Sequence, residues 1–104
     1  MTAFSLDRIR TEGIDQAGAA AVTHLEGRPG FWIHVDLDVL SPDWMPAVDS
    51  PDPGGMTPTE LTKVLKRAIW SRKCVGMELT IYDPERDPAG RCANLIVDML
   101  SDAV

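Results

Sequence analysis

Residues 31–55 read FWIHVDLDVLSPDWMPAVDSPDPGG. The first ten of them, 31–40, are apolar and rich in β-branched side chains, which is typical of a buried strand. Asp36 and Asp38 stand at alternate positions near the end of this run, and alternate side chains of a strand point to the same face. His34 lies one step earlier on that face. We therefore expect a strand that ends in a small polar cluster.

The two carboxylates leave two interpretations open. Paired ionised carboxylates repel each other, and a divalent cation removes that penalty. Carboxylate oxygens suit Mg²⁺, Mn²⁺ or Ca²⁺, and an added imidazole shifts the choice toward transition metals. The alternative is a pair that is simply solvated at a strand end. The segment 41–56, with four prolines and the pair Gly54-Gly55, favours a metal site, because long loops after parallel strands often carry ligands.

The composition is that of one globular unit. The chain has 104 residues, 44% of them hydrophobic and 25% charged, so we expect a single segment over 1–104. The net charge of −6 disfavours nucleic acid and anionic membrane surfaces as partners. No apolar run approaches about 18 residues, and the N-terminus lacks a signal-peptide pattern. We therefore expect a cytoplasmic location, and in that setting the isolated Cys74 and Cys92 are predicted to be buried free thiols and not a disulfide.

Helical patterns flank the first strand. Residues 5–10 are compatible with one helical turn, and apolar residues at helical spacing from Ile14 predict a helix that stops at Gly27. A second helix is predicted to begin at Pro58, with Thr57 as its N-cap and Glu60 closing a capping box. Its basic side we expect to be solvated; this side carries Lys63, Lys66 and Arg67.

A second strand is predicted over Cys74–Tyr82, and Glu78 interrupts its apolar pattern. In a central strand this carboxylate needs a partner, whereas at an edge it can be solvated. Asp87 then predicts the cap of a last helix with Pro88 in its first turn. Strands that alternate with helices indicate a parallel sheet. Two strands cannot bury three helices, so the chain is expected to be part of a larger α/β domain or a protomer that must pair.

The same residues carry a family resemblance. The chain resembles the arginase and agmatinase (ureohydrolase) family, most strongly over residues 31–100. The matching motifs are Asp36-Leu37-Asp38, Ser41-Pro42, the run 46–51, Gly54-Gly55-Met56-Thr57, the Val75-Gly76 strand, Asp83-Pro84 and Arg86-Asp87-Pro88.

The resemblance implies a three-layer α/β/α fold with a parallel sheet, of which only the C-terminal part is present. It also implies a site for two Mn²⁺ ions and C–N hydrolysis of a small guanidino or amidine-type substrate. By position, Asp36 would bridge the two ions and Asp38 would bind one of them. We expect His34 and Glu78 to lie behind these ligands and orient them, and we assign no catalytic residue. The alternative for His34 is a strand histidine that bonds to a backbone carbonyl.

Three departures from the family pattern matter. The family's earlier histidine and its Asp-x-His-x-Asp ligands are missing, since His24 and His34 are the only histidines. We therefore expect the isolated chain to be inactive. Ile81 stands where the family has a glutamate that grips the guanidinium, which puts arginine and agmatine in doubt as substrates. Ser41 stands where the family most often has aspartate, a change that we expect to alter only a loop hydrogen bond.

Two other functions compete with this interpretation. The run Asp36–Leu40 also fits the opening of haloacid-dehalogenase-type phosphatases, but their downstream lysine and acidic pair are absent from the expected strand ends. The other alternative is a non-catalytic α/β fragment that self-associates. Sheet edges left open in a short chain favour such pairing, so we expect a homo-oligomer.

Overall fold

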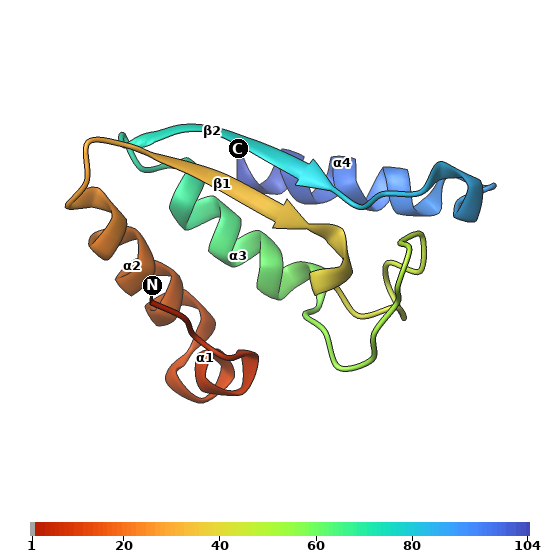
Figure 1. Ribbon diagram of the computed structural model, residues 1–104, viewed down its shortest axis with the longest axis horizontal. Helices are drawn as coiled ribbons and strands as arrows, with labels where there is room; N and C mark the ends of the chain where they lie inside the picture. Colours follow the sequence, from red (N-terminus) through yellow and green to blue (C-terminus); the bar gives the residue numbers. More distant parts are fainter. Residues whose placement is uncertain (1) are drawn as a thin grey trace.

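A computed structural model describes residues 2–104 (Figure 1). Helices and strands alternate along the chain after two N-terminal helices. Their order is α1 (Leu6–Glu12), α2 (Ile14–Glu26), β1 (Phe31–Asp36), the 3-10 turn η1 (Leu37–Val39), α3 (Pro58–Ile69), β2 (Cys74–Thr80), the 3-10 turn η2 (Pro84–Arg86) and α4 (Arg91–Ala103). The predicted α/β architecture with a parallel sheet is confirmed, since β1 and β2 pair in parallel.

The first strand is shorter than the predicted run 31–40. It ends at Asp36, and η1 follows, with the Leu40 N–H donating to the Leu37 carbonyl at 3.2 Å. Leu37 and Leu40 are both 1% exposed. Residues three apart share a side in a 3-10 turn but lie on opposite faces of a strand, so only the turn buries both leucines. This placement overturns the expectation that Asp36 and Asp38 share a strand face.

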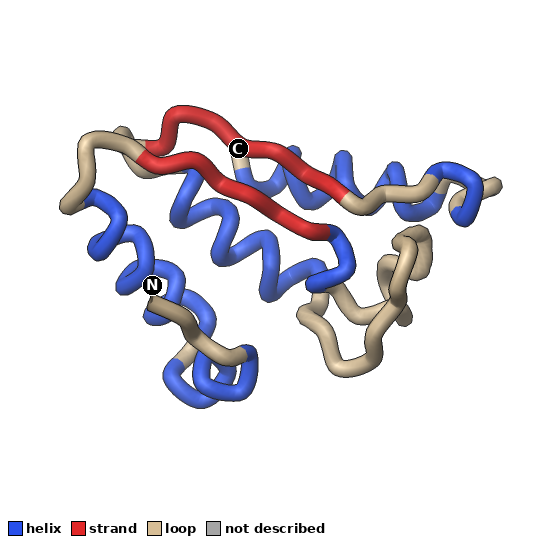
Figure 2. Tube along the Cα trace, viewed as in Figure 1, coloured by secondary structure: helices blue, strands red, loops and turns tan. Residues whose placement is uncertain are grey.

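The hydrophobic core lies on one face of the sheet. Val35 packs there with Leu61 and Leu65 of α3 and with Met99 of α4. Figures 1 and 2 show α3 between α2 and α4, which agrees with the packing of α3 against both helices. The other face of β1 carries exposed side chains, and Trp32 is 57% exposed. Within residues 2–104, each strand also has one edge without a strand partner.

The long loop after β1 is irregular, as expected, and it contributes to the core. Met45 and Ala47 are fully buried and Val48 is 1% exposed. Val48 pairs with Tyr82, which follows β2. A Cβ added to Gly55 would lie 2.6 Å from the Val39 carbonyl oxygen, so only glycine allows the loop to return this close to η1. The loop is therefore packed against both strand ends.

The capping of α3 is confirmed. The Thr57 hydroxyl accepts from the Glu60 N–H at 3.2 Å, and the Glu60 carboxylate accepts from the Thr57 N–H at 2.9 Å. The helix from Ile14 is also confirmed, ending at Glu26 before Gly27, while α1 extends over Leu6–Glu12, beyond the single turn expected.

The predicted start of the last helix is wrong, because α4 begins at Arg91 and not at Pro88. The Gly90 N–H donates to the Asp87 carbonyl, which closes a turn before the helix. The Asp87 carboxylate nevertheless caps α4 from outside, since it accepts from the N–H groups of Cys92 at 3.0 Å and Ala93 at 2.9 Å.

The second strand stops at Thr80, two residues before the predicted end, because Ile81 has a φ of 77° that breaks the extended backbone. Cys74 and Cys92 are free thiols, as predicted. None of the helices in residues 2–104 has the length and apolar character needed to cross a membrane.

Candidate metal centre at the strand ends

Three of the four predicted site residues, His34, Asp36 and Glu78, gather on the exposed face of the two strands. In the parallel register, His34 lies opposite Glu78 and Asp36 lies opposite Thr80. The pairing joins residues 44 apart in the chain, so the sequence pattern alone did not reveal which side chains would meet. Glu78 has the polar partner that we expected of a carboxylate in an apolar strand, and this partner is His34. Its strand, β2, also lies at an edge of the described sheet.

The His34 imidazole bonds to two carboxylates at once. Its Nδ1 lies 2.8 Å from Glu78 Oε1 and its Nε2 lies 2.8 Å from Asp36 Oδ1. These bonds raise the pKa of His34, the bond to Glu78 most and the bond to Asp36 next. The three side chains are each about half exposed (52%, 50% and 52%), so water screens these ion pairs and they add little to stability.

Asp36 is held by a second strand as well. The Thr80 hydroxyl donates to Asp36 Oδ1, the same oxygen that meets His34. Both bonds favour the ionised carboxylate and lower the pKa of Asp36, the Thr80 bond more than the His34 bond. Thr80 was not predicted, because its role follows from the strand register and from no local motif.

Asp38 is separated from this cluster by the change of backbone. It lies half-buried in η1 and not on β1, so the structure brings together His34, Asp36, Glu78 and Thr80 on the strands and leaves Asp38 on the turn that follows. In residues 2–104, no group of three or more histidine, cysteine or acidic side chains has an arrangement that could hold a metal ion.

The carboxylates of Asp36 and Asp38 are of a type that binds Mn²⁺, but they are too few for a site with two ions. Carboxylate oxygens suit Mn²⁺. Two carboxylates are too few to hold two ions, and Oδ1 of Asp36 already accepts hydrogen bonds from its neighbours. A complete centre would therefore require donors from outside residues 2–104.

Ile81 lies at the end of β2, next to this cluster in the chain. It is 38% exposed and is the one residue other than glycine with a positive φ among those described. An isoleucine at this position offers an incoming molecule an apolar side chain and no charge.

Comparisons with known proteins found one matching family and several similar proteins. A family model described as "Arginase family" matches residues 1–104. The N(omega)-hydroxy-L-arginine amidinohydrolase of Streptomyces lavendulae is 34% identical over 90 residues, which cover 85% of this chain and 32% of that protein. An uncharacterized 32.2 kDa protein of Methanothermus fervidus is 34% identical over 73 residues, 67% of this chain and 25% of its own length.

Solved structures show the same fold. The arginase of Bacillus subtilis matches 99% of this chain with a TM-score of 0.89 and 19% identity, and the match covers 36% of that arginase. The arginase of Bacillus caldovelox matches 96% of this chain with a TM-score of 0.86 and 21% identity. The chain thus spans only a quarter to about a third of the proteins it matches. These matches confirm the arginase-like fold and disfavour the phosphatase alternative.

Proposed function

Because this chain belongs to the arginase family, we propose that it forms the C-terminal part of a hydrolase that breaks a carbon–nitrogen bond of a guanidino or amidine group. The family match along the whole chain carries this proposal. The position of Asp36 at the carboxyl end of a parallel strand supports it, since ligands of open α/β sheets bind at that end. The two free cysteines support a cytoplasmic location.

The metal site proposed here is a partial one. Asp36 and Asp38 are the two proposed Mn²⁺ ligands of this chain, and a site for two ions needs further donors supplied from outside it. His34 and Glu78 are proposed to position Asp36 through the hydrogen bonds that join the three side chains. By itself the 104-residue chain is expected to bind Mn²⁺ weakly and to hydrolyse no guanidino compound.

The proposed substrate is a small molecule. The protein binds its reacting group without the help of a carboxylate at position 81, where the residue is isoleucine. Ile81 cannot form an ion pair with a guanidinium, and its 38% exposed side chain favours contact with an uncharged part of the substrate. Arginine and agmatine are therefore disfavoured relative to a compound with a less basic amidine-type group.

The test combines metal binding with an activity assay. Mn²⁺ binding is followed by electron paramagnetic resonance for the wild-type chain and for Asp36→Asn, Asp38→Asn and the control Asp43→Asn, whose aspartate is exposed in the loop. We expect weak binding that either site variant abolishes and the control preserves. Hydrolysis of arginine, agmatine and formimidoyl-glutamate by the chain alone should be absent.

Two results would overturn this proposal. Turnover of any of these compounds by the purified 104-residue chain would show that the missing donors are not needed. Mn²⁺ binding that survives both Asp36→Asn and Asp38→Asn would place the metal elsewhere.

A second candidate function is non-catalytic self-association. The observation that favours it is that, within residues 2–104, each strand has one edge without a strand partner, beside a face that exposes Trp32. We expect sedimentation equilibrium to give a homo-oligomer that Trp32→Lys weakens, with Trp44→Lys, in the loop, as the matched control. A monomer at all concentrations tested would argue against this candidate.

A further inference from the structure

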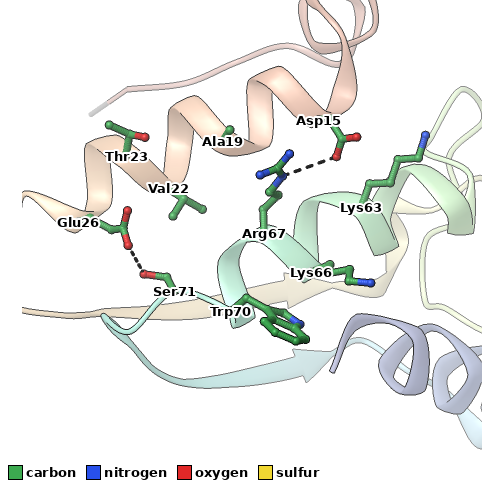
Figure 3. A pocket seen from close by; sticks show the side chains of 10 residues that line it. All are labelled: Asp15, Ala19, Val22, Thr23, Glu26, Lys63, Lys66, Arg67, Trp70 and Ser71. Carbon is green, nitrogen blue, oxygen red and sulfur yellow. Dashed lines mark hydrogen bonds and ion pairs between the residues drawn. The ribbon is translucent and has the colours of Figure 1, made fainter.

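A groove of about 620 Å³ runs between α2 and α3 (Figure 3). The small side chains Ala19 and Val22 of α2 line it together with polar and aromatic residues of both helices. The full lining is Asp15, Ala19, Val22, Thr23, Glu26, Lys63, Lys66, Arg67, Trp70 and Ser71. A volume of this size is in the range of sites for small organic ligands.

Polar contacts between the helices span the groove at two places. Arg67 Nε lies 3.7 Å from Asp15 Oδ1, and the Ser71 hydroxyl donates to Glu26 Oε2 at 2.8 Å. Figure 3 shows these two pairs at separate points along α2. Arg67 and both acidic groups of the groove therefore already have partners from the neighbouring element.

Lys63 and Lys66 are the cations of the groove that have no such partner. Among the described residues, no carboxylate oxygen lies within 4.0 Å of either ammonium group. Asp98 and Asp102 of α4 line a smaller neighbouring cavity with the same two lysines, yet neither forms an ion pair with them. In a protein of net charge −6, these two lysines are a local attraction for an anion.

Trp70 places an aromatic surface beside these lysines. It follows Lys66 by four residues and Lys63 by seven, so the three side chains share one side of α3 and its end. The indole is 68% exposed, and its N–H donates to the Ala103 carbonyl at 3.0 Å. That bond fixes the ring at the groove and leaves much of its surface open to a ligand.

We propose that this groove binds a small organic anion with a planar aromatic group. The anionic group, a phosphate or a carboxylate, is held by Lys63 and Lys66, and the aromatic group packs on Trp70. The groove is separate from the candidate metal centre: Glu26 and Ser71 precede β1 and β2 at their amino ends, whereas Asp36 lies at the carboxyl end of β1.

The probe is adenosine monophosphate, with adenosine and inorganic phosphate measured separately. Binding is followed by two-dimensional amide NMR of the whole chain, including the indole N–H signals. We expect saturable, millimolar or tighter binding of adenosine monophosphate, with shifts at Trp70 and at α2 and α3, and weaker binding of each part alone. Carboxylate-bearing indole-3-acetate, measured in parallel, distinguishes the two kinds of anion.

Charge-matched variants make the assignment specific. Lys63→Gln and Lys66→Gln should each weaken adenosine monophosphate binding by about twofold to fivefold, as expected for loss of one exposed ionic contact. Lys73→Gln removes the same charge from the one lysine outside the groove and should leave the affinity unchanged. Trp70→Leu should weaken adenosine monophosphate and adenosine alike, with no effect on phosphate.

Several results would overturn the proposal. The first is the absence of saturation up to about 10 mM, since a dissociation constant of that size corresponds to a binding free energy of less than about 3 kcal/mol. The second is a set of NMR shifts confined to residues outside the groove. The third is a loss of affinity in Lys73→Gln equal to that in Lys66→Gln. Phosphate binding as tight as that of adenosine monophosphate would exclude the aromatic contact. Circular dichroism and the urea midpoint of each variant establish that the fold is kept, so that a change in affinity refers to the groove.

Discussion

Arg10 and Glu60 form a two-pronged ion pair that joins α1 to the first turn of α3. Nε and Nη2 of Arg10 each lie 2.9 Å from a Glu60 oxygen, and Nη2 also donates to the Gly55 carbonyl at 3.2 Å. The same carboxylate accepts the Thr57 N–H of the capping box. These bonds, the Arg10 bond first, lower the pKa of Glu60 to about 2.

The first prediction is an acid-dependent loss of stability through Glu60. A carboxylate whose pKa is depressed on folding stabilises the protein fully above its unfolded pKa, here 4.5, and loses that contribution as the pH falls toward 2. Glu60→Gln keeps the acceptor of the capping box and removes the ion pair with Arg10, so it should lower the free energy of unfolding at pH 7 by about 1 kcal/mol, the upper end for a partly exposed pair. The difference from wild type should shrink as the pH falls through this window, measured by urea unfolding.

Glu12→Gln is the matched control for this experiment. Glu12 pairs with Arg8 one turn earlier on α1, and both side chains are about half exposed. Such a pair contributes about 0.2–0.5 kcal/mol. The interpretation fails if Glu60→Gln is no less stable than wild type at neutral pH, or if the difference between them does not depend on pH.

The second prediction concerns the one tyrosine of the chain. The Tyr82 hydroxyl donates to Asp87 Oδ2 at 2.7 Å, and this bond to an anion raises the pKa of Tyr82 to about 12. Asp87→Asn removes the negative charge, so the pKa of Tyr82 should fall toward its ordinary value of 10.0. Ultraviolet absorbance of the tyrosinate reports this single group directly.

Asp83→Asn serves as the control for Asp87→Asn. Asp83 raises the pKa of Tyr82 only through a weaker charge interaction, so its variant should shift the titration much less. A wild-type tyrosine that titrates near 10.0, or one whose titration is unchanged in Asp87→Asn, contradicts the assignment. Asp87→Asn should also unfold at a lower temperature than Asp83→Asn, because α4 loses a charged cap.

The third prediction follows from the backbone of Ile81. A φ of 77° costs a β-branched residue about 1–2 kcal/mol relative to glycine. Ile81→Gly relieves this strain while it removes a side chain that is 38% exposed. The two effects oppose each other, so the free energy of unfolding should stay within about 1 kcal/mol of wild type. Urea unfolding measures it.

Val75→Gly gives the comparison for this variant. Val75 is 69% exposed in β2 and does not have a positive φ, so glycine there brings only the loss of strand stability, about 1 kcal/mol. Val75→Gly should therefore destabilise the chain more than Ile81→Gly does. The reverse order would mean that the Ile81 backbone is not strained.

Local signals predicted the parts of the fold that depend on neighbouring residues. Thr57, Pro58 and Glu60 specify the start of α3 within four positions of the chain, and the structure forms that capping box. The alternation of strands and helices likewise predicted the parallel pairing of β1 and β2. The capping box lies within one element, and the parallel pairing follows from the order of the elements and from no particular side-chain contact.

Distant contacts explain what the sequence could not predict. The strand 31–40 ends early because Leu37 and Leu40 must both reach a core built from later residues. The bond between Thr80 and Asp36 depends on the register of β1 against β2, which brings together residues 44 positions apart in the chain. The basic side of α3, expected to be solvated, lines a groove because α2 packs against that helix.

The contacts of His34 also restrict what can complete the strand-end cluster. Nδ1 faces Glu78 of β2 and Nε2 faces Asp36 of β1, so in this arrangement neither ring nitrogen is open to a cation. The imidazole acts as a spacer that sets how far apart the two acids stand. Any nitrogen ligand that joins Asp36 at a metal ion must therefore come from a residue other than His34.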